Sequence, residues 1–147
     1  TVAVFLSFDG ELDTQPLIEQ LWRAGKRVYL PVLHPFSAGN LLFLNYHPQS
    51  ELVMNRLKIH EPKLDVRDVL PLSRLDVLIT PLVAFDEYGQ RLGMGGGFYD
   101  RTLQNWQHYK TQPVGYAHDC QLVEKLPVEE WDIPLPAVVT PSKVWEW

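Results

Sequence analysis

Short apolar runs, separated by one amphipathic segment, open the chain. Residues 2–7 form a run with the length and composition of an interior strand. A helix is predicted after it, because Asp13 or Thr14 can cap the first turn and Pro16 suits the position that follows. The apolar face of this helix consists of Leu17, Ile18, Leu21 and Trp22. Residues 27–31 predict a second strand, so the region forms a βαβ unit whose strands run parallel.

Later apolar runs predict the other strands of the same sheet. They cover residues 41–46, 75–80, 114–117, 138–140 and 143–145. Residues 98–107 predict a second helix, whereas residues 47–74 show weak periodicity and are expected to form a long irregular excursion. This order of elements predicts an α/β fold with an open, mostly parallel, Rossmann-like sheet and helices on both faces.

The size and composition of the chain fit one compact domain. Its 147 residues, 46% of them hydrophobic, suffice for a sizeable core, so we expect a single α/β domain over residues 1–147. There is no apolar run of membrane length and no secretory pattern at the start. The single Cys120 cannot form an internal disulfide, which favours a reducing, cytoplasmic compartment.

Charge and motif content argue against several classes of function. The formal net charge of −5 and the pI near 5.4 disfavour nucleic acid as the main partner, because a phosphate backbone requires a basic stripe. The five histidines are scattered without metal-ligand spacing, which disfavours a zinc site. The chain also lacks a Gly-x-Ser-x-Gly elbow. These features favour phosphoryl transfer and positioning over a covalent enzyme intermediate.

Residues 89–101 contain the most informative pattern, Gly-Gln-Arg-Leu-Gly-Met-Gly-Gly-Gly-Phe-Tyr-Asp-Arg. Glycine occupies four of the five positions 93–97, where the backbone can adopt positive φ and approach a ligand closely. A helix that begins near Phe98 adds unpaired amide donors. Because the segment follows the predicted strand 75–80, it lies at the carboxyl edge of the sheet, where open α/β folds bind ligands. A phosphate-binding loop is therefore predicted, with a flexible surface loop as the alternative.

General phosphate-binding fingerprints do not identify the ligand of this loop. It lacks the Gly-Lys-Ser/Thr ending of a P-loop, and Phe98 stands where the dinucleotide fingerprint has its third glycine. The nearest cations are Arg91 and Arg101, so a divalent metal ion or a basic segment outside this chain is expected to balance a polyphosphate. A flat ring has nearby apolar candidates, for which core packing is the alternative: Phe85, Met94, Phe98 and Tyr99.

Several carboxylates are candidates for ligand or metal binding at this edge. The helix dipole alone favours an acid at Asp100, but next to a phosphate this carboxylate requires a bridging cation and becomes a candidate Mg²⁺ ligand. Asp132 is a second candidate and equally an ordinary turn residue. Asp9 and Glu11 follow the first predicted strand, either as a polar turn or at the ligand crevice, where Leu6 would also lie.

The likeness to a known family is carried by five segments, residues 5–11, 59–62, 80–86, 89–101 and 126–132. In order and spacing they resemble the 5-formyltetrahydrofolate cyclo-ligase family, also called methenyltetrahydrofolate synthetase, over nearly the whole chain. The resemblance implies a fold similar to that of sugar-phosphate isomerases and CoA transferases, and a place in cytoplasmic one-carbon metabolism. In the implied reaction, the formyl oxygen attacks the γ-phosphate of MgATP, N10 closes the ring, and 5,10-methenyltetrahydrofolate, ADP and phosphate are released.

The resemblance also implies roles for individual residues. ATP is expected to contact Arg91, Leu92, Gly93, Met94, Gly95, Gly96, Gly97, Phe98 and Tyr99. The folate is expected to contact Leu6, Glu11 and Glu61 and to border Met94, Gly95, Gly96, Gly97 and Phe98. Arg91 and Asp100 are the expected catalytic residues, and Asp100 and Asp132 the expected Mg²⁺ ligands. The implied partners are small molecules, without nucleic acid or membrane, and a monomer is favoured.

Two departures from the family pattern bear on activity. Leu57 stands where some members have an aromatic residue that stacks on the benzoyl group. Family members also carry a basic helical segment before the first strand, which this chain lacks, so weak nucleotide binding is expected of these 147 residues. Two other functions stay open: an ATP-independent sugar-phosphate isomerase or acyl transferase on the same fold, and a folate or nucleotide binding protein without turnover.

Overall fold

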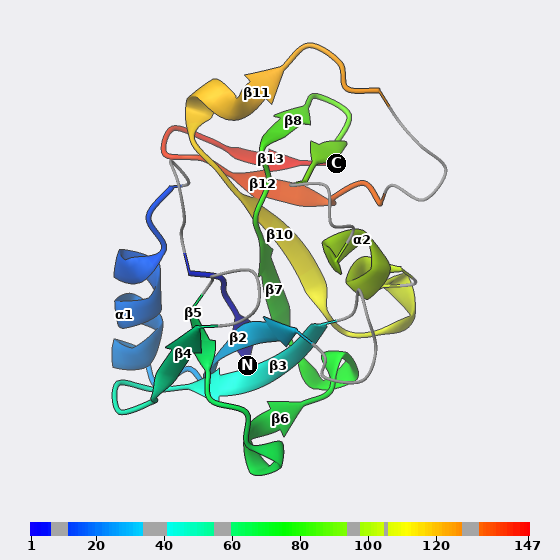
Figure 1. Cartoon of the computed structure of the whole chain (residues 1–147). Coiled ribbons are helices and arrows are strands. Elements are labelled where there is room, and N and C mark those ends of the chain that lie inside the picture. Colours follow the sequence, from blue (N-terminus) through cyan, green and yellow to red (C-terminus); the bar gives the residue numbers. More distant parts are fainter. Residues whose placement is uncertain (7–11, 34–40, 55–59, 94–97, 105, 128–132) are drawn as a thin grey trace.

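The main sheet of the protein is open and mostly parallel, as the sequence predicts. The computed structural model describes residues 1–6, 12–33, 41–54, 60–93, 98–104, 106–127 and 133–147. Within these residues, eight strands follow the order β13-β12-β10-β7-β1-β2-β3-β6 (Figure 1). They are β1 (Val2–Ala3), β2 (Val28–Leu33), β3 (Leu41–Tyr46), β6 (Val69–Leu70), β7 (Val77–Thr80), β10 (Gln112–Tyr116), β12 (Ala137–Val139) and β13 (Val144–Glu146). The strands from β12 to β2 pair in parallel, whereas β13, β3 and β6 pair antiparallel at the two edges.

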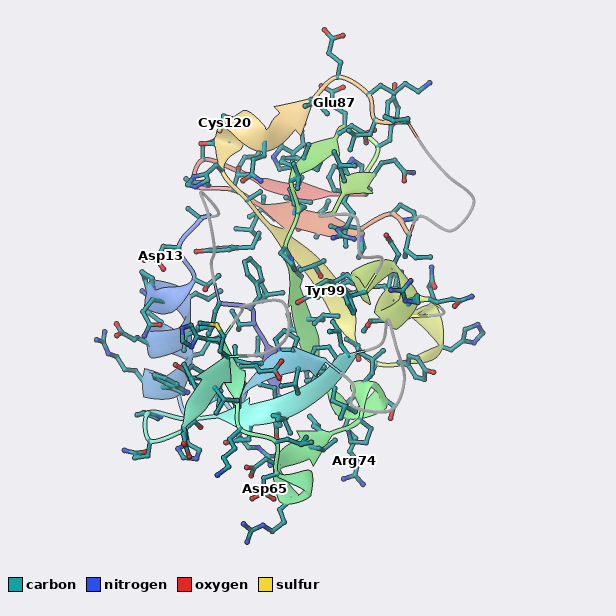
Figure 2. The ribbon with its side chains drawn as sticks, in the orientation of Figure 1. Asp13, Asp65, Arg74, Glu87, Tyr99 and Cys120 are labelled. Carbon is teal, nitrogen blue, oxygen red and sulfur yellow. The ribbon has the colours of Figure 1, made fainter. Side chains whose placement is uncertain are left out.

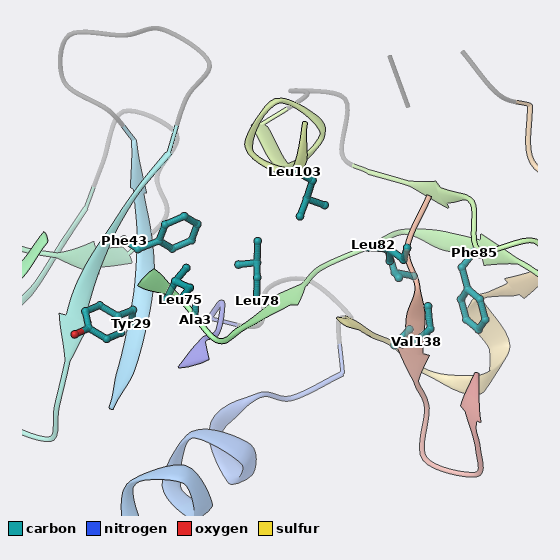
Figure 3. Packing of buried hydrophobic residues seen from close by; sticks show 11 residues of the cluster. Ala3, Tyr29, Phe43, Leu75, Leu78, Leu82, Phe85, Leu103 and Val138 are labelled. Carbon is teal, nitrogen blue, oxygen red and sulfur yellow. The ribbon is translucent and has the colours of Figure 1, made fainter. Parts of the chain in front are cut away.

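The sheet carries a helix on each face, which confirms the predicted layers. α1 (Gln15–Arg23) covers one face, where Ile18 joins a buried cluster with Val4 and Ile79. α2 (Phe98–Leu103) covers the other, where Leu103 points toward the sheet and joins the cluster that contains Leu78 (Figure 3). Leu78 and Ile79 belong to different clusters because successive side chains of a strand point to opposite faces. The parallel strands are therefore buried on both sides, as parallel sheets require.

The start of α1 differs in one detail from the predicted capping. Pro16 occupies the first turn, and the carboxylate of Asp13 accepts a hydrogen bond of 3.0 Å from the N–H of Gln15. Thr14 is buried, however, and its hydroxyl donates to the backbone carbonyl of Phe5 at 2.7 Å. Thr14 therefore ties α1 to the end of β1 and does not cap the helix with its side chain.

Residues 47–74 contain more regular structure than predicted. They hold β4 (Leu52–Met54), β5 (His60–Pro62), β6 and two 3-10 turns, Val66–Asp68 and Leu72–Arg74. β4 and β5 form an antiparallel pair, and β6 extends the main sheet beside β3. The prediction of an irregular excursion was wrong, because strands of two or three residues are too short to show a periodicity and are defined by their pairing partners.

A small second sheet was also missed by the sequence pattern. Its order is β11-β8-β9, formed by β8 (Ala84–Asp86), β9 (Arg91–Leu92) and β11 (Leu122–Val123).

The predicted helix 98–107 is shorter in the structure, because α2 ends at Leu103 and a 3-10 turn follows at Trp106–His108. A further 3-10 turn covers Asp119–Gln121. In the described part of the chain, no helix has the length and apolar character needed to cross a membrane.

Two glycines with positive φ allow a matched test of this fold. Gly25 has φ +75° with open space around its missing Cβ, whereas a Cβ on Gly89 (φ +82°) would lie 2.6 Å from the carbonyl oxygen of Leu135. We expect Gly25→Ala to lower the free energy of unfolding by about 1 kcal/mol, the cost of a left-handed alanine. Gly89→Ala should cost about 2–4 kcal/mol, because displacement of the Leu135 backbone adds to that strain. Urea unfolding of both variants measures the difference, and equal losses would contradict the packing described at Gly89.

Candidate active site

Arg91 is a buried cation at the carboxyl end of β7. It lies in β9, the second strand of the β8–β9 hairpin, and its side chain is only 5% exposed. One guanidinium nitrogen, Nη2, donates to the backbone carbonyl of Pro81 at 2.9 Å, directly after β7. The other, Nη1, lies 3.5 Å from Oδ1 of Asp100. The hairpin thus carries a positive charge to the sheet edge where the sequence predicts a ligand site.

Asp100 holds this cation from the first turn of α2. Its side chain is 18% exposed, and Oδ1 also accepts a hydrogen bond of 3.3 Å from the backbone N–H of Ile133. The carboxylate therefore joins β9 and α2 to the chain at Ile133, which leads to β12 and lies 33 positions further along the sequence. Partial burial lowers the effective dielectric constant, so the attraction between Arg91 and Asp100 is stronger than for a surface pair.

Gly93 and Tyr99 flank the guanidinium group of Arg91. A Cβ on Gly93 would lie 2.8 Å from Nη2 of Arg91, so any larger residue here would require the guanidinium group to shift. The ring of Tyr99 has its centroid 5.8 Å from Cζ of Arg91 and packs against the core cluster beside β7 (Figure 2). Phe98 faces Arg101 instead, at 5.5 Å, and Leu92 is 48% exposed. Of the predicted ATP contacts, Arg91, Gly93 and Tyr99 are thus brought together.

Polar groups at the ends of β1 and β10 form a second part of this edge. The hydroxyl of Tyr116 donates to the backbone carbonyl of Asp13 at 3.2 Å, and its ring meets Phe5 edge-on at 6.4 Å. Burial raises the pKa of the Tyr116 hydroxyl and the charge of Asp13 acts in the same direction, so this group remains a proton donor at neutral pH. Leu6 is half-buried and packs against the cluster that contains Phe5 and Ile18.

Gln121 fixes the segment that follows β7, a role that the sequence pattern did not reveal. Its amide nitrogen donates to the backbone carbonyls of Leu82 and Val83 at 2.8 and 3.0 Å, and its amide oxygen accepts from the N–H of His118 at 2.6 Å. The carbonyl of Pro81, which binds Arg91, immediately precedes this segment. A glutamine in a short 3-10 turn carries no sequence signal for such a contact.

The remaining predicted site residues lie outside the described part of the chain or in β5. Glu11, Asp132, Leu57 and residues 94–97 lie outside the described residues. Glu61 is described, in β5, where it pairs with Val53 of β4. β5 lies to the left of β7 in Figure 1 and α2 to its right. The predicted folate contact at Glu61 therefore belongs to the β4–β5 pair, and the predicted metal ligand Asp100 to α2.

The metal chemistry available to the described residues is limited. They contain no group of three or more histidines, cysteines, aspartates or glutamates placed to hold a metal ion. Mg²⁺, however, is commonly bound through one or two carboxylates plus substrate phosphates and water. The partly exposed carboxylate of Asp100 fits that mode, in which one protein carboxylate binds the ion and the substrate's phosphate oxygens supply most of its other ligands.

An apolar hollow lies away from this edge. It has a volume of about 320 Å³ and is formed at the β3–β6 edge of the sheet, with Thr102 of α2 at its rim. The other lining residues are Leu41, Leu42, Phe43, Val69, Leu70, Pro71 and Leu72. The Thr102 hydroxyl already donates to the backbone carbonyl of Phe98, and the other residues offer neither charge nor side-chain hydrogen-bond donors, so the hollow is unsuited to a phosphate compound.

Comparison with known proteins gives one consistent family. A sequence model described as the 5-formyltetrahydrofolate cyclo-ligase family matches residues 1–141. A 5-formyltetrahydrofolate cyclo-ligase of Haemophilus influenzae is 60% identical over 134 residues, which cover 91% of this chain and 72% of that protein. One from Mycolicibacterium smegmatis is 32% identical over 146 residues, which cover 97% of this chain and 74% of that protein.

Solved structures agree with this match. The NMR structure of Aquifex aeolicus 5,10-methenyltetrahydrofolate synthetase aligns with a TM-score of 0.80 at 32% identity, over 99% of this chain and 70% of that one. A 5,10-methenyltetrahydrofolate synthetase from Mycoplasma pneumoniae aligns with a TM-score of 0.68 at 22% identity, over 93% of this chain and 70% of that one, a likeness that concerns the fold alone. The expected α/β fold is confirmed.

Proposed function

The chain belongs to the 5-formyltetrahydrofolate cyclo-ligase family, and from this premise we propose that it converts 5-formyltetrahydrofolate to 5,10-methenyltetrahydrofolate with ATP as co-substrate. The observation that supports the site of this reaction is the buried Arg91, held by Asp100 and Pro81 where the glycine segment begins. The isomerase and acyl-transferase alternatives are not favoured, because the relatives named above are cyclo-ligases or methenyltetrahydrofolate synthetases. The cytoplasm remains the proposed compartment.

The proposed reaction proceeds in two steps. First, the formyl oxygen of the substrate attacks the γ-phosphorus of ATP; the bond from that phosphorus to the ADP oxygen breaks, and a phosphorylated iminium is formed. Second, N10 attacks the activated formyl carbon and loses its proton, the carbon–oxygen bond breaks, and inorganic phosphate leaves with its electron pair. The protein needs to align two bound substrates and to balance negative charge, because neither step requires a covalent link to the enzyme.

Arg91 is suited to balance the charge of the transferred phosphoryl group. Its guanidinium group is withdrawn from water and is fixed by Pro81 and Asp100, so it would not need to reorient as charge develops. The backbone at Gly93 passes close enough to share an anion with it. We therefore propose that residues 91–99 hold the ATP phosphates and that Leu6, Glu11 and Glu61 contact the folate.

Asp100 is the proposed link between the protein and Mg²⁺, with Asp132 as the proposed second ligand. When bound, the ion would neutralise phosphate oxygens and draw negative charge from the leaving ADP. Asp100 would hold it through the carboxylate and would retain Arg91 through Oδ1, which already receives that guanidinium group. The same residue would then orient both positive charges of the site.

The proposed function can be tested by direct assay. We expect the methenyl chromophore to appear when the protein is mixed with 5-formyltetrahydrofolate, ATP and Mg²⁺, with one ADP released for each product molecule. Omission of ATP, or chelation of the metal by EDTA, should abolish the signal, because ATP provides the phosphoryl group and Mg²⁺ balances its charge during the transfer. Binding of both substrates without ADP release would indicate the non-catalytic alternative, and conversion of a sugar phosphate without ATP would indicate an isomerase.

A further inference from the structure

Asp86 is a fully buried carboxylate at the end of β8 whose hydrogen-bond donors belong to the backbone. Oδ1 accepts from the N–H groups of Tyr88 and Gln90 at 2.9 and 3.1 Å. Oδ2 accepts from the N–H of Leu126 at 3.0 Å. A carboxylate is seldom buried to this degree unless such bonds replace its hydration. The three donors therefore fix Asp86 to the segments from which they come.

The first of these segments is the turn that leads to Arg91. Tyr88 and Gln90 lie in this turn, which is also closed by a backbone bond of 3.1 Å from the N–H of Asp86 to the carbonyl of Gln90. β9 is only two residues long and pairs Arg91 with Phe85 of β8. A slip of one residue in this register would turn the Arg91 side chain to the opposite face of the hairpin. The turn held by Asp86 thus determines where the guanidinium group points.

The second segment that Asp86 holds is the one that follows β11. Leu126 follows β11, which runs parallel to β8 and pairs Val123 with Asp86. Seven positions after Leu126, the N–H of Ile133 donates to Oδ1 of Asp100. One buried carboxylate therefore binds two chain segments, the hairpin that carries Arg91 through Oδ1 and the segment that follows β11 through Oδ2.

We propose that Asp86 is a positioning residue of the ligase reaction. It holds the β8–β9 turn in the register that keeps the Arg91 guanidinium group on Pro81 and Asp100, where it faces the phosphates of ATP. The role of Arg91 toward ATP rests on the proposed function, whereas the dependence of the Arg91 position on Asp86 rests on the contacts described above.

Asp86→Asn tests this role with the smallest change of shape. An amide keeps one oxygen acceptor, but its NH₂ group would meet an N–H donor that the carboxylate accepts now. We expect KM for ATP to rise about tenfold, because a small displacement of a positioned group has effects of this size or larger, while KM for 5-formyltetrahydrofolate stays within about twofold. A merely structural role would lower the melting temperature and leave the ratio of the two KM values unchanged.

Thr111→Val is the matched control. The buried hydroxyl oxygen of Thr111 lies 2.7 and 2.8 Å from the backbone carbonyl oxygens of Leu72 and Leu75, to one of which it donates at a time. Thr111 precedes β10, at the opposite end of this strand from Tyr116. The variant should lose thermal stability without any change in KM for ATP. All assays are run at a temperature where circular dichroism shows each variant folded. If both variants lose stability and neither shifts KM for ATP, the proposed role of Asp86 is overturned.

A second readout does not depend on turnover. In a two-dimensional ¹H–¹⁵N spectrum, the buried side chain of Arg91 should give a slowly exchanging N–H signal, identified by its loss in Arg91→Lys. We expect Asp86→Asn to shift this signal and speed its exchange with water, and Thr111→Val to preserve it. An unchanged signal in Asp86→Asn would refute the positioning role even if the wild type is active. A wild type without activity would refute the proposed function, and the spectra would still decide the role of Asp86.

Discussion

Replacing Arg91 with alanine will lower kcat/KM for ATP by about a hundredfold to a thousandfold. Loss of one positioned group that stabilises developing charge has effects of this order in other enzymes. The effect is expected to be large here because the guanidinium group is only 5% exposed and is fixed by Pro81 and Asp100. A fixed, dehydrated charge interacts more strongly with a phosphoryl group than a mobile surface charge does.

Two further variants define the cause of that loss. Arg91→Lys keeps the charge but lacks the planar guanidinium group that reaches Pro81 and Asp100 together. We therefore expect its kcat/KM for ATP to be only about tenfold higher than that of Arg91→Ala. Arg67→Ala removes an equal charge from an exposed residue paired with Asp65, which is labelled at the bottom of Figure 2. Steady-state kinetics on the three proteins give the comparison. Equal activity of Arg91→Ala and Arg67→Ala would remove Arg91 from the site.

Asp100→Asn will reduce Mg²⁺-dependent turnover by about a hundredfold while the protein stays folded. The amide oxygen of asparagine can still accept from the N–H of Ile133, so the contact between α2 and that segment is kept. The negative charge is lost, and with it the proposed ligand of Mg²⁺ and the electrostatic partner of Arg91. The expected signature is a fall in kcat together with a higher Mg²⁺ concentration for half-maximal rate.

The control for Asp100→Asn is an aspartate without a proposed role. Asp68 lies exposed in the 3-10 turn Val66–Asp68, and Asp68→Asn removes the same charge. The kinetics and the melting temperature of Asp68→Asn should match the wild type, since surface substitutions change stability little. A fully active Asp100→Asn protein would exclude Asp100 from metal binding. A large loss of melting temperature in that variant would instead assign it a mainly structural role.

The sequence pattern predicted the parts of the fold whose elements carry their own signal. The helix after Asp13 and the strand within residues 75–80 show periodicity or a long apolar run, and both are found, as α1 and β7. β6, β9 and β11 have two residues each and exist because a partner strand lies beside them. Information of this kind belongs to the tertiary structure, so local periodicity does not contain it.

The candidate site likewise has parts that the local sequence predicts and parts that depend on the tertiary structure. The glycine pattern and the resemblance predicted Arg91 and Asp100 separately as site candidates, a cation and an acid near one loop. Their contact depends on the hairpin register, which is fixed by Asp86 through backbone groups that are four and forty residues away in the sequence. The contact that Gln121 makes with Leu82 depends equally on tertiary packing. Residue types could therefore be predicted, whereas the network that holds them required the structure.

A crystal structure of the protein with Mg²⁺, a non-hydrolysable ATP analogue and 5-formyltetrahydrofolate tests the central claim most directly. We predict that the terminal phosphates contact the guanidinium group of Arg91 and the backbone of the glycine segment, with the metal ion between the γ-phosphate and Asp100. The formyl oxygen should point at the γ-phosphorus. A triphosphate bound elsewhere, without contact to the guanidinium group of Arg91, would contradict the account.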